Sequence, residues 1–100
     1  MNIAKMFAES MQRMQKIRQE LSEARLEGTA GGQAVKAVVS GLGDLVDLQI
    51  SPEVVDPNDV GMLQDLVVAA FKEALTNARD LQQEKAKEMT GGIPIPGLFS

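Results

Sequence analysis

Leu26 to Ile50, LEGTAGGQAVKAVVSGLGDLVDLQI, is the stretch from which the rest of the fold follows. Apolar side chains recur there at every second position, the period of a half-buried strand. Glycine-rich turns at residues 30–33 and 41–44 divide the stretch into three runs, at residues 26–30, 34–40 and 45–50. Both faces of the second run carry apolar residues. We therefore expect a three-stranded antiparallel meander.

A helical pattern precedes the strands. One face of the predicted helix, which we call its seam, is formed by residues spaced four and three apart, with a single polar break at Ser10: Ile3, Phe7, Ser10, Met14, Ile17, Leu21 and Ala24. These steps of four and three residues predict an amphipathic helix of about 22 residues, roughly 33 Å long. Three methionines, Met6, Met11 and Met14, lie on or beside the seam and are typical of adaptable packing.

A second, longer helix follows the strands. Ser51-Pro52 ends the third strand, and Asp56-Pro57 has the signature of a helix start, with Asp56 as cap and Pro57 as the first helical residue. The second seam is Val60, Leu63, Val67, Ala70, Ala74, Asn77 and Leu81. Thr90-Gly91-Gly92 then stops the helix. The fold class is α+β in the order α-β-β-β-α, with one domain over residues 1–92 and a Pro- and Gly-containing extended tail over residues 93–100.

The length of the second helix predicts a dimer. A helix over residues 57–89 would be roughly 50 Å long, whereas a compact domain of this size has a radius of gyration of about 13 Å. The helix must project from its own domain and lie against the first helix as an antiparallel arm. Two partly projecting helices leave part of the sheet uncovered, and a second copy of the chain is the simplest cover.

Composition excludes most enzyme chemistry. The chain has no Cys and no His, which removes thiol nucleophiles, disulfides, imidazole bases and most metal sites. Neither glycine-rich turn has the spacing of a phosphate-binding loop. Asp80, Glu84 and Glu88 recur at four-residue spacing, as on a solvated helix face. We expect no catalytic residue, no cofactor, no metal and no small-molecule substrate. Because no signal peptide or membrane span is evident, we expect a soluble, cytoplasmic protein.

The charges are unevenly distributed along the chain. The net charge is −4, yet residues 1–25 hold five cations against three acids, and residues 10–19 hold Arg13, Lys16 and Arg18 with no acid. A local positive surface can thus survive in an acidic protein. An ordinary solvated helix face is the alternative explanation. On local charge we name six candidate contacts for an anionic partner: Arg13, Lys16, Arg18, Arg25, Arg79 and Lys85.

Several motifs in this order resemble the YbaB/EbfC family of bacterial nucleoid-associated proteins. They are Met11-Gln12-Arg13-Met14-Gln15-Lys16, Glu27-Gly28-Thr29-Ala30-Gly31-Gly32, residues 35–41, Leu48-Gln49-Ile50-Ser51-Pro52-Glu53, residues 63–71 and the tail motif Ile95-Pro96-Gly97-Leu98-Phe99. The resemblance implies a tweezer-like homodimer whose paired helices form two arms. It also implies binding of double-stranded DNA with little sequence preference, and a role in nucleoid organisation and gene expression. The arms would then meet phosphates without reading bases.

A second function suits the same predicted fold. A non-enzymatic adaptor or chaperone-like clamp would use the arms, with Met6, Met11 and Met14 exposed, to hold protein segments. Reversing the charges of the first helix would abolish the DNA function, whereas polar replacement of the methionines would damage the clamp.

Overall fold

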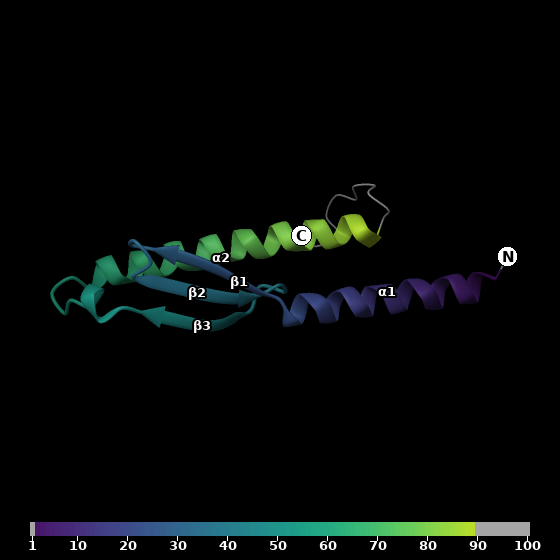
Figure 1. The fold of residues 1–100 in the computed structure, drawn as a ribbon, viewed down its shortest axis with the longest axis horizontal. Helices are drawn as coiled ribbons and strands as arrows, with labels where there is room; N and C mark the ends of the chain where they lie inside the picture. The colour runs from purple at the N-terminus through teal and green to yellow at the C-terminus, as the bar shows by residue number, and fades with distance from the viewer. Residues whose placement is uncertain (1, 90–100) are drawn as a thin grey trace.

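The architecture is a three-stranded sheet with one long helix packed on one face and a second long helix projecting from one end of the sheet (Figure 1). A computed structural model describes residues 2–89. Its elements are α1 (Ile3–Glu23), β1 (Arg25–Ala30), β2 (Val35–Ser40), β3 (Leu45–Ile50), the 3-10 helix η1 (Pro52–Val54) and α2 (Val60–Met89). The predicted order α-β-β-β-α is confirmed. The predicted helix stop at residues 90–92 and the tail at residues 93–100 lie outside the described residues.

The sheet is the predicted antiparallel meander, in the order β1-β2-β3. Its first turn contains three successive residues with positive φ, namely Gly31 at 64°, Gly32 at 65° and Gln33 at 74°. Glycine adopts this left-handed backbone without a steric penalty, which explains the pair of glycines in the turn. The register of β2 against β3 shifts between Val38 and Val39, as it does at a β-bulge.

α2 covers one face of the sheet over β1 and β2. The buried core consists of Val35, Ala37 and Val39 from β2 and Ala70, Ala74 and Ala78 from α2. Small side chains on the helix bring its backbone close to β1, where Gly28 faces the backbone of α2 at Ala70 and Ala74. Asn77, in the predicted seam, donates from Nδ2 to the Glu27 carbonyl oxygen at 2.8 Å. The polar seam position thus attaches α2 to the sheet.

The predicted start of the second helix is wrong by one turn. α2 begins at Val60 because Asp59, not Asp56, caps it, accepting the Met62 amide at 3.2 Å. Asp56 instead accepts the Asn58 amide at 2.9 Å and forms a local turn that contains Pro57. Two aspartates three residues apart can each cap a helix, and the one nearer the apolar seam does so here. The helix therefore has 30 residues and not 33.

The molecule is strongly elongated, with extents of 68 × 21 × 16 Å. Its radius of gyration is 18.1 Å, compared with about 13 Å for a compact chain of this length. α2 is about 45 Å long, whereas a six-residue strand spans about 20 Å. Gln82 still lies at the end of the sheet, where its Nε2 donates to the Gly41 carbonyl oxygen at 2.7 Å. The last turns of α2 therefore extend beyond the sheet, as predicted, and α1 extends in the same direction (Figure 1).

β3 is the edge strand that α2 leaves uncovered. Leu48 pairs with Ala37, and Leu45 pairs with Val39, so both lie on the face that α2 covers elsewhere. Ala37 and Val39 are completely buried, yet Leu48 is 36% exposed and Leu45 is 53% exposed. An apolar edge strand of this kind usually meets another chain.

Candidate nucleic-acid interface

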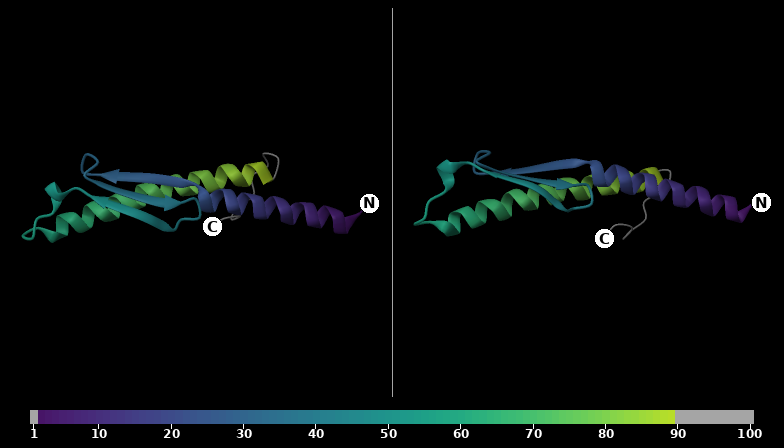
Figure 2. Two further views of the ribbon diagram at one scale, coloured as in Figure 1. Left: turned by 60° about the horizontal axis from the view of Figure 1, so that its bottom comes forward. Right: turned by 90° about the horizontal axis from the view of Figure 1, so that it is seen from below.

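Two antiparallel helical arms carry most of the predicted contacts. One arm is α1 and the other is the part of α2 that extends beyond the sheet, and they lie side by side in Figures 1 and 2. α1 starts at Asn2, whose side chain accepts the Lys5 amide at 3.0 Å. Leu21 joins it to the end of the sheet by accepting the Gly41 amide at 2.8 Å, and both Ile17 and Leu21 are buried.

An ion pair ties the two arms together. Lys85 Nζ lies 2.9 Å from Glu20 Oε2 on α1 and 3.6 Å from Glu88 Oε2 on its own helix. The hydrogen bond from Lys85 lowers the pKa of the Glu20 carboxyl group, and the charge of Lys16 contributes to this shift. The same hydrogen bond raises the pKa of Lys85. Both groups are therefore ionised at neutral pH, and the pair spans the arms where they leave the sheet.

Arg13, Lys16 and Arg18 are all exposed on α1, and within residues 2–89 none of them forms an ion pair. They do not share one face. At about 100° per residue, Arg13 and Lys16 lie about 60° apart, whereas Arg18 lies about 140° from Arg13 on the other side of the apolar seam. Arg13 and Lys16 are therefore the pair that one phosphate backbone can meet together.

The other three predicted residues occupy different places. Arg25 lies where α1 joins β1, and its guanidinium donates to the carbonyl oxygens of Ser22 at 2.9 Å and Ala24 at 3.0 Å. Arg79 is exposed on α2, one residue after the buried Ala78. Lys85 lies between the arms in the ion pair with Glu20. The six candidates therefore form no single cluster, although every one is on an arm or at its base.

Lys5 belongs with the exposed cations but was not among the six candidates. It is exposed on α1 and lies eleven residues before Lys16. Eleven residues are close to three full helical turns, so the two lysines lie within about 20° of each other around the helix. Arg13 lies on the same side. The eleven-residue spacing from Lys16 identifies Lys5 in the sequence. A count of charges over a short stretch such as residues 10–19 misses it.

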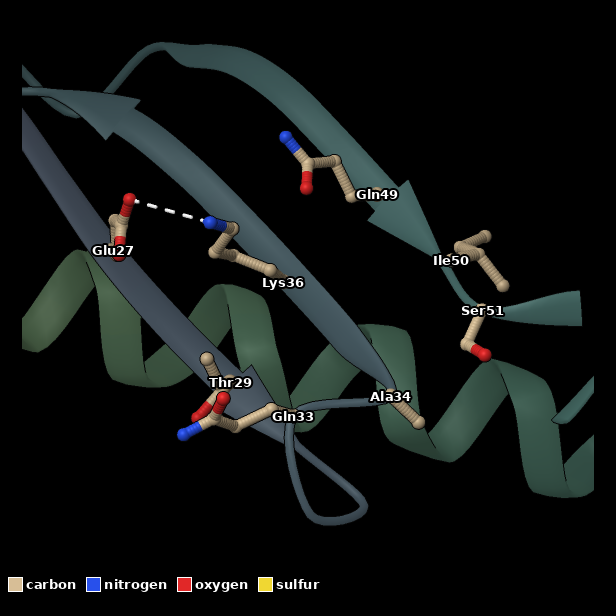
Figure 3. A pocket seen from close by; sticks show the side chains of 8 residues that line it. All are labelled: Glu27, Thr29, Gln33, Ala34, Lys36, Gln49, Ile50 and Ser51. Carbon is tan, nitrogen blue, oxygen red and sulfur yellow. Dashed lines mark ion pairs between the residues drawn. The ribbon is translucent and has the colours of Figure 1, made fainter. Parts of the chain in front are cut away.

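A shallow hollow of about 420 Å³ lies on the face of the sheet opposite α2 (Figure 3). Its lining is mainly polar: Glu27, Thr29, Gln33, Ala34, Lys36, Gln49, Ile50 and Ser51. The Lys36 ammonium lies 3.6 Å from Glu27 Oε1, so this cation is already compensated. The hollow presents no activated nucleophile or acid–base pair.

Residues 2–89 offer neither a metal site nor a membrane-spanning helix. No group of three or more acidic side chains there is arranged to hold a metal ion. No helix in that part of the chain combines the length and the apolar character that a membrane span requires.

The chain is similar to known proteins along nearly its whole length. The sequence profile of the YbaB/EbfC DNA-binding family matches residues 1–93. A nucleoid-associated protein of Pelotomaculum thermopropionicum is 43% identical, over 98% of this chain and 96% of that protein. Another from Acetivibrio thermocellus is 48% identical, over 92% of this chain and 83% of that one. An uncharacterized Helicobacter pylori protein of known crystal structure shares the fold with a TM-score of 0.79 at 20% identity, over 91% of this chain and 99% of that chain.

Proposed function

The chain belongs to the YbaB/EbfC DNA-binding family, and we propose that it acts as a homodimer that binds double-stranded DNA through phosphate contacts, with little sequence preference. Its similarity to nucleoid-associated proteins supports a location at the nucleoid and an influence on gene expression. The observation that carries the proposal is the pair of projecting arms, one of which bears exposed cations without ion-pair partners among residues 2–89. No chemical reaction is part of this function.

The contacts favour the phosphate backbone over the bases. Lys and Arg on an exposed helix meet phosphates through charge, which carries no sequence information. The chain has no Trp or Tyr to stack on an unpaired base. On α1, Lys5, Arg13 and Lys16 lie along one side over a length of about 17 Å. Such a line can follow a backbone without entering a groove.

A second copy would double the set of arms. The uncovered face of β3, with Leu45 and Leu48 exposed, is the surface we assign to the dimer. Burial of this strip would remove apolar side chains from water, which is the usual driving force for a stable homodimer. The two sets of cations would then be related by a twofold axis and could straddle one duplex.

Fluorescence anisotropy of labelled duplexes tests the proposal. We expect binding that differs little between unrelated sequences and weakens steeply with salt. Lys16→Glu should weaken binding strongly. Lys72→Glu is the matched control, because Lys72 is also an exposed helical lysine but lies on α2 over the sheet. Equal losses in the two variants, or no binding of the wild-type protein at low salt, would contradict the proposal.

The second candidate function is a clamp for protein segments. Its supporting observation is the exposure of Met6, Met11 and Met14 on α1, at 56%, 41% and 49%. Methionine surfaces adapt to varied apolar partners. If this is the function, replacing the three methionines with serine removes activity while Lys16→Glu leaves it intact.

A further inference from the structure

The two arms meet at one residue of the turn between β2 and β3. The Gly41 amide donates to the Leu21 carbonyl oxygen of α1 at 2.8 Å, and the Gly41 carbonyl oxygen accepts Gln82 Nε2 of α2 at 2.7 Å. Gly41 itself is buried. Its two backbone groups therefore link α1 to α2 at the end of the sheet from which both arms leave (Figure 1).

A side chain at Gly41 would displace α1. A Cβ atom there would lie 2.6 Å from the Leu21 carbonyl oxygen and 2.9 Å from Leu21 Cα. Both atoms belong to the backbone of the last turn of α1, whose carbonyl groups lack the usual partners four residues later in the helix. The end of α1 is therefore seated directly on the turn, and the Gly41 amide satisfies one of these carbonyl groups.

The turn is a firm support for this contact. Ser40 is buried, and its hydroxyl oxygen accepts the amides of Leu42 at 3.2 Å and Asp44 at 3.3 Å. The Ser40 amide donates to the Asp44 carbonyl oxygen at 2.8 Å and closes the turn. The covalent connection of α1 to the sheet, in contrast, is the single extended residue Ala24. The direction in which α1 leaves the sheet therefore depends on the contacts of its last turns.

α1 is a long lever, so a small change at its base is a large one at its tip. Lys5 lies sixteen residues before Leu21, about 24 Å along the helix, whereas Lys16 lies about 8 Å from Leu21. A tilt of about 15° at the base would move Lys5 by about 6 Å and Lys16 by only about 2 Å. The cations of α1 thus follow one phosphate backbone only if the tilt of the helix is fixed.

We propose, on the basis of the proposed duplex binding, that Gly41 is the joint that sets the angle between the arms and that Gln82 is a positioning residue for the phosphate contacts. Gln82 lies one turn before Lys85 on α2, so its hydrogen bond lies beside the ion pair from Lys85 to Glu20. Salt screens an ion pair at the surface, whereas it does not screen a hydrogen bond between neutral amides. Gln82 therefore holds the arms at salt concentrations that weaken the ion pair.

Spin labels test the joint in the absence of DNA. The chain has no Cys, so Ala8→Cys on α1 and Asp80→Cys on α2 give two unique labelling sites, and both positions are exposed. Dilution with unlabelled protein restricts the measured distance to one copy of the chain. We expect Gln82→Met to lengthen and broaden the distance distribution. Gln83→Met is the matched control and should leave it unchanged, because Gln83 is the adjacent, exposed glutamine and methionine favours helix as glutamine does.

The salt dependence of duplex binding tests the positioning role. If Lys5 of both copies loses its phosphate, the logarithmic salt slope of Gln82→Met should be shallower than that of the wild-type protein by about 2. A general loss of stability would lower the active fraction and leave this slope unchanged. An unchanged label distance would overturn the proposal, and so would a longer distance with the wild-type slope. Failure of the proposed function is a separate outcome, in which the wild-type protein binds no duplex while the label distance still responds to Gln82→Met.

Discussion

Replacing Gly28 with alanine should separate α2 from the sheet and destabilise the protein strongly. A Cβ atom at Gly28 would overlap the Ala70 carbonyl oxygen and the Ala74 amide nitrogen, and it would lie 3.0 Å from the Glu73 carbonyl carbon. All three atoms are helix backbone, so no side-chain rotation relieves the contact. α2 would have to shift as a unit away from β1, and the buried packing of Ala70 and Ala74 would loosen with it.

The expected loss is about 3 kcal/mol, at the upper end of what overpacking costs, because the obstruction is backbone. With a urea dependence of about 1–3 kcal/mol per M, the unfolding midpoint should fall by about 1–3 M. Far-UV circular dichroism follows the transition, and both proteins must be compared at one concentration in case they dimerise.

The same chemical change at Gly61 is the matched control. An added Cβ there meets nothing within 4 Å, and the residue lies in the first turn of α2. Alanine is the better helix former, so Gly61→Ala should stabilise the protein by up to about 1 kcal/mol. If Gly28→Ala leaves the midpoint unchanged or moves it the same way as Gly61→Ala, the close approach of α2 to β1 is wrong.

Three further predictions concern the arms and the dimer. If Lys5, Arg13 and Lys16 of both copies all engage phosphates, the logarithm of the binding constant should fall with the logarithm of salt concentration with a slope of about −5; a slope near zero would mean that these cations do not engage phosphates. Leu48→Asp on β3 should convert the proposed dimer to a monomer in sedimentation while circular dichroism stays unchanged, whereas a variant that still sediments as a dimer would place the interface elsewhere. The ion pair lowers the pKa of Glu20 and raises the pKa of Lys85, so it should persist through neutral pH. It should weaken as pH falls through the pKa of the Glu20 carboxyl group in the folded protein, which lies below 4.5. It should weaken again as pH rises past 10.5, where Lys85 loses its proton. Spin labels on α1 and α2 measure the distance between the two arms, which should increase slightly, and in a salt-sensitive way, at acid pH. Glu20→Gln should cause the same increase at neutral pH. A distance that does not change with pH would show that packing alone holds the arms together.

The helices and strands whose apolar residues recur with a clear period could be predicted from the sequence. The residues at which they begin and end depended on local hydrogen bonds. The seam of α1 and the alternation in the strands predicted those elements to within a residue or two. The start of α2 was not predictable in this way, because Asp56 and Asp59 offer equivalent caps. Only the hydrogen bond from the Met62 amide to Asp59 distinguishes them.

The candidate site was less predictable, because its arrangement depends on contacts between distant parts of the chain. A count of charges placed Lys85 among the candidate DNA contacts, and it could not show that Lys85 Nζ pairs with Glu20, sixty-five positions earlier in the sequence. The count also grouped Arg18 with Arg13 and Lys16, although helical phase separates them. The angular positions of the three cations around the helix could be calculated from the sequence. The ion pair could not, because it depends on the packing of α2 beside α1.

That ion pair bears on how an acidic chain can bind a polyanion. At physiological salt, charges more than about 8 Å apart are largely screened at a surface, so a phosphate against Lys16 responds to its near neighbours and not to the net charge of −4. The acid one turn along from Lys16 is Glu20, and its charge is already balanced by Lys85. By balancing Glu20, Lys85 therefore supports the positive potential of α1 around Lys16. On this reasoning Lys85→Met should weaken duplex binding although its side chain points between the arms, and Glu20→Gln should restore binding to that variant.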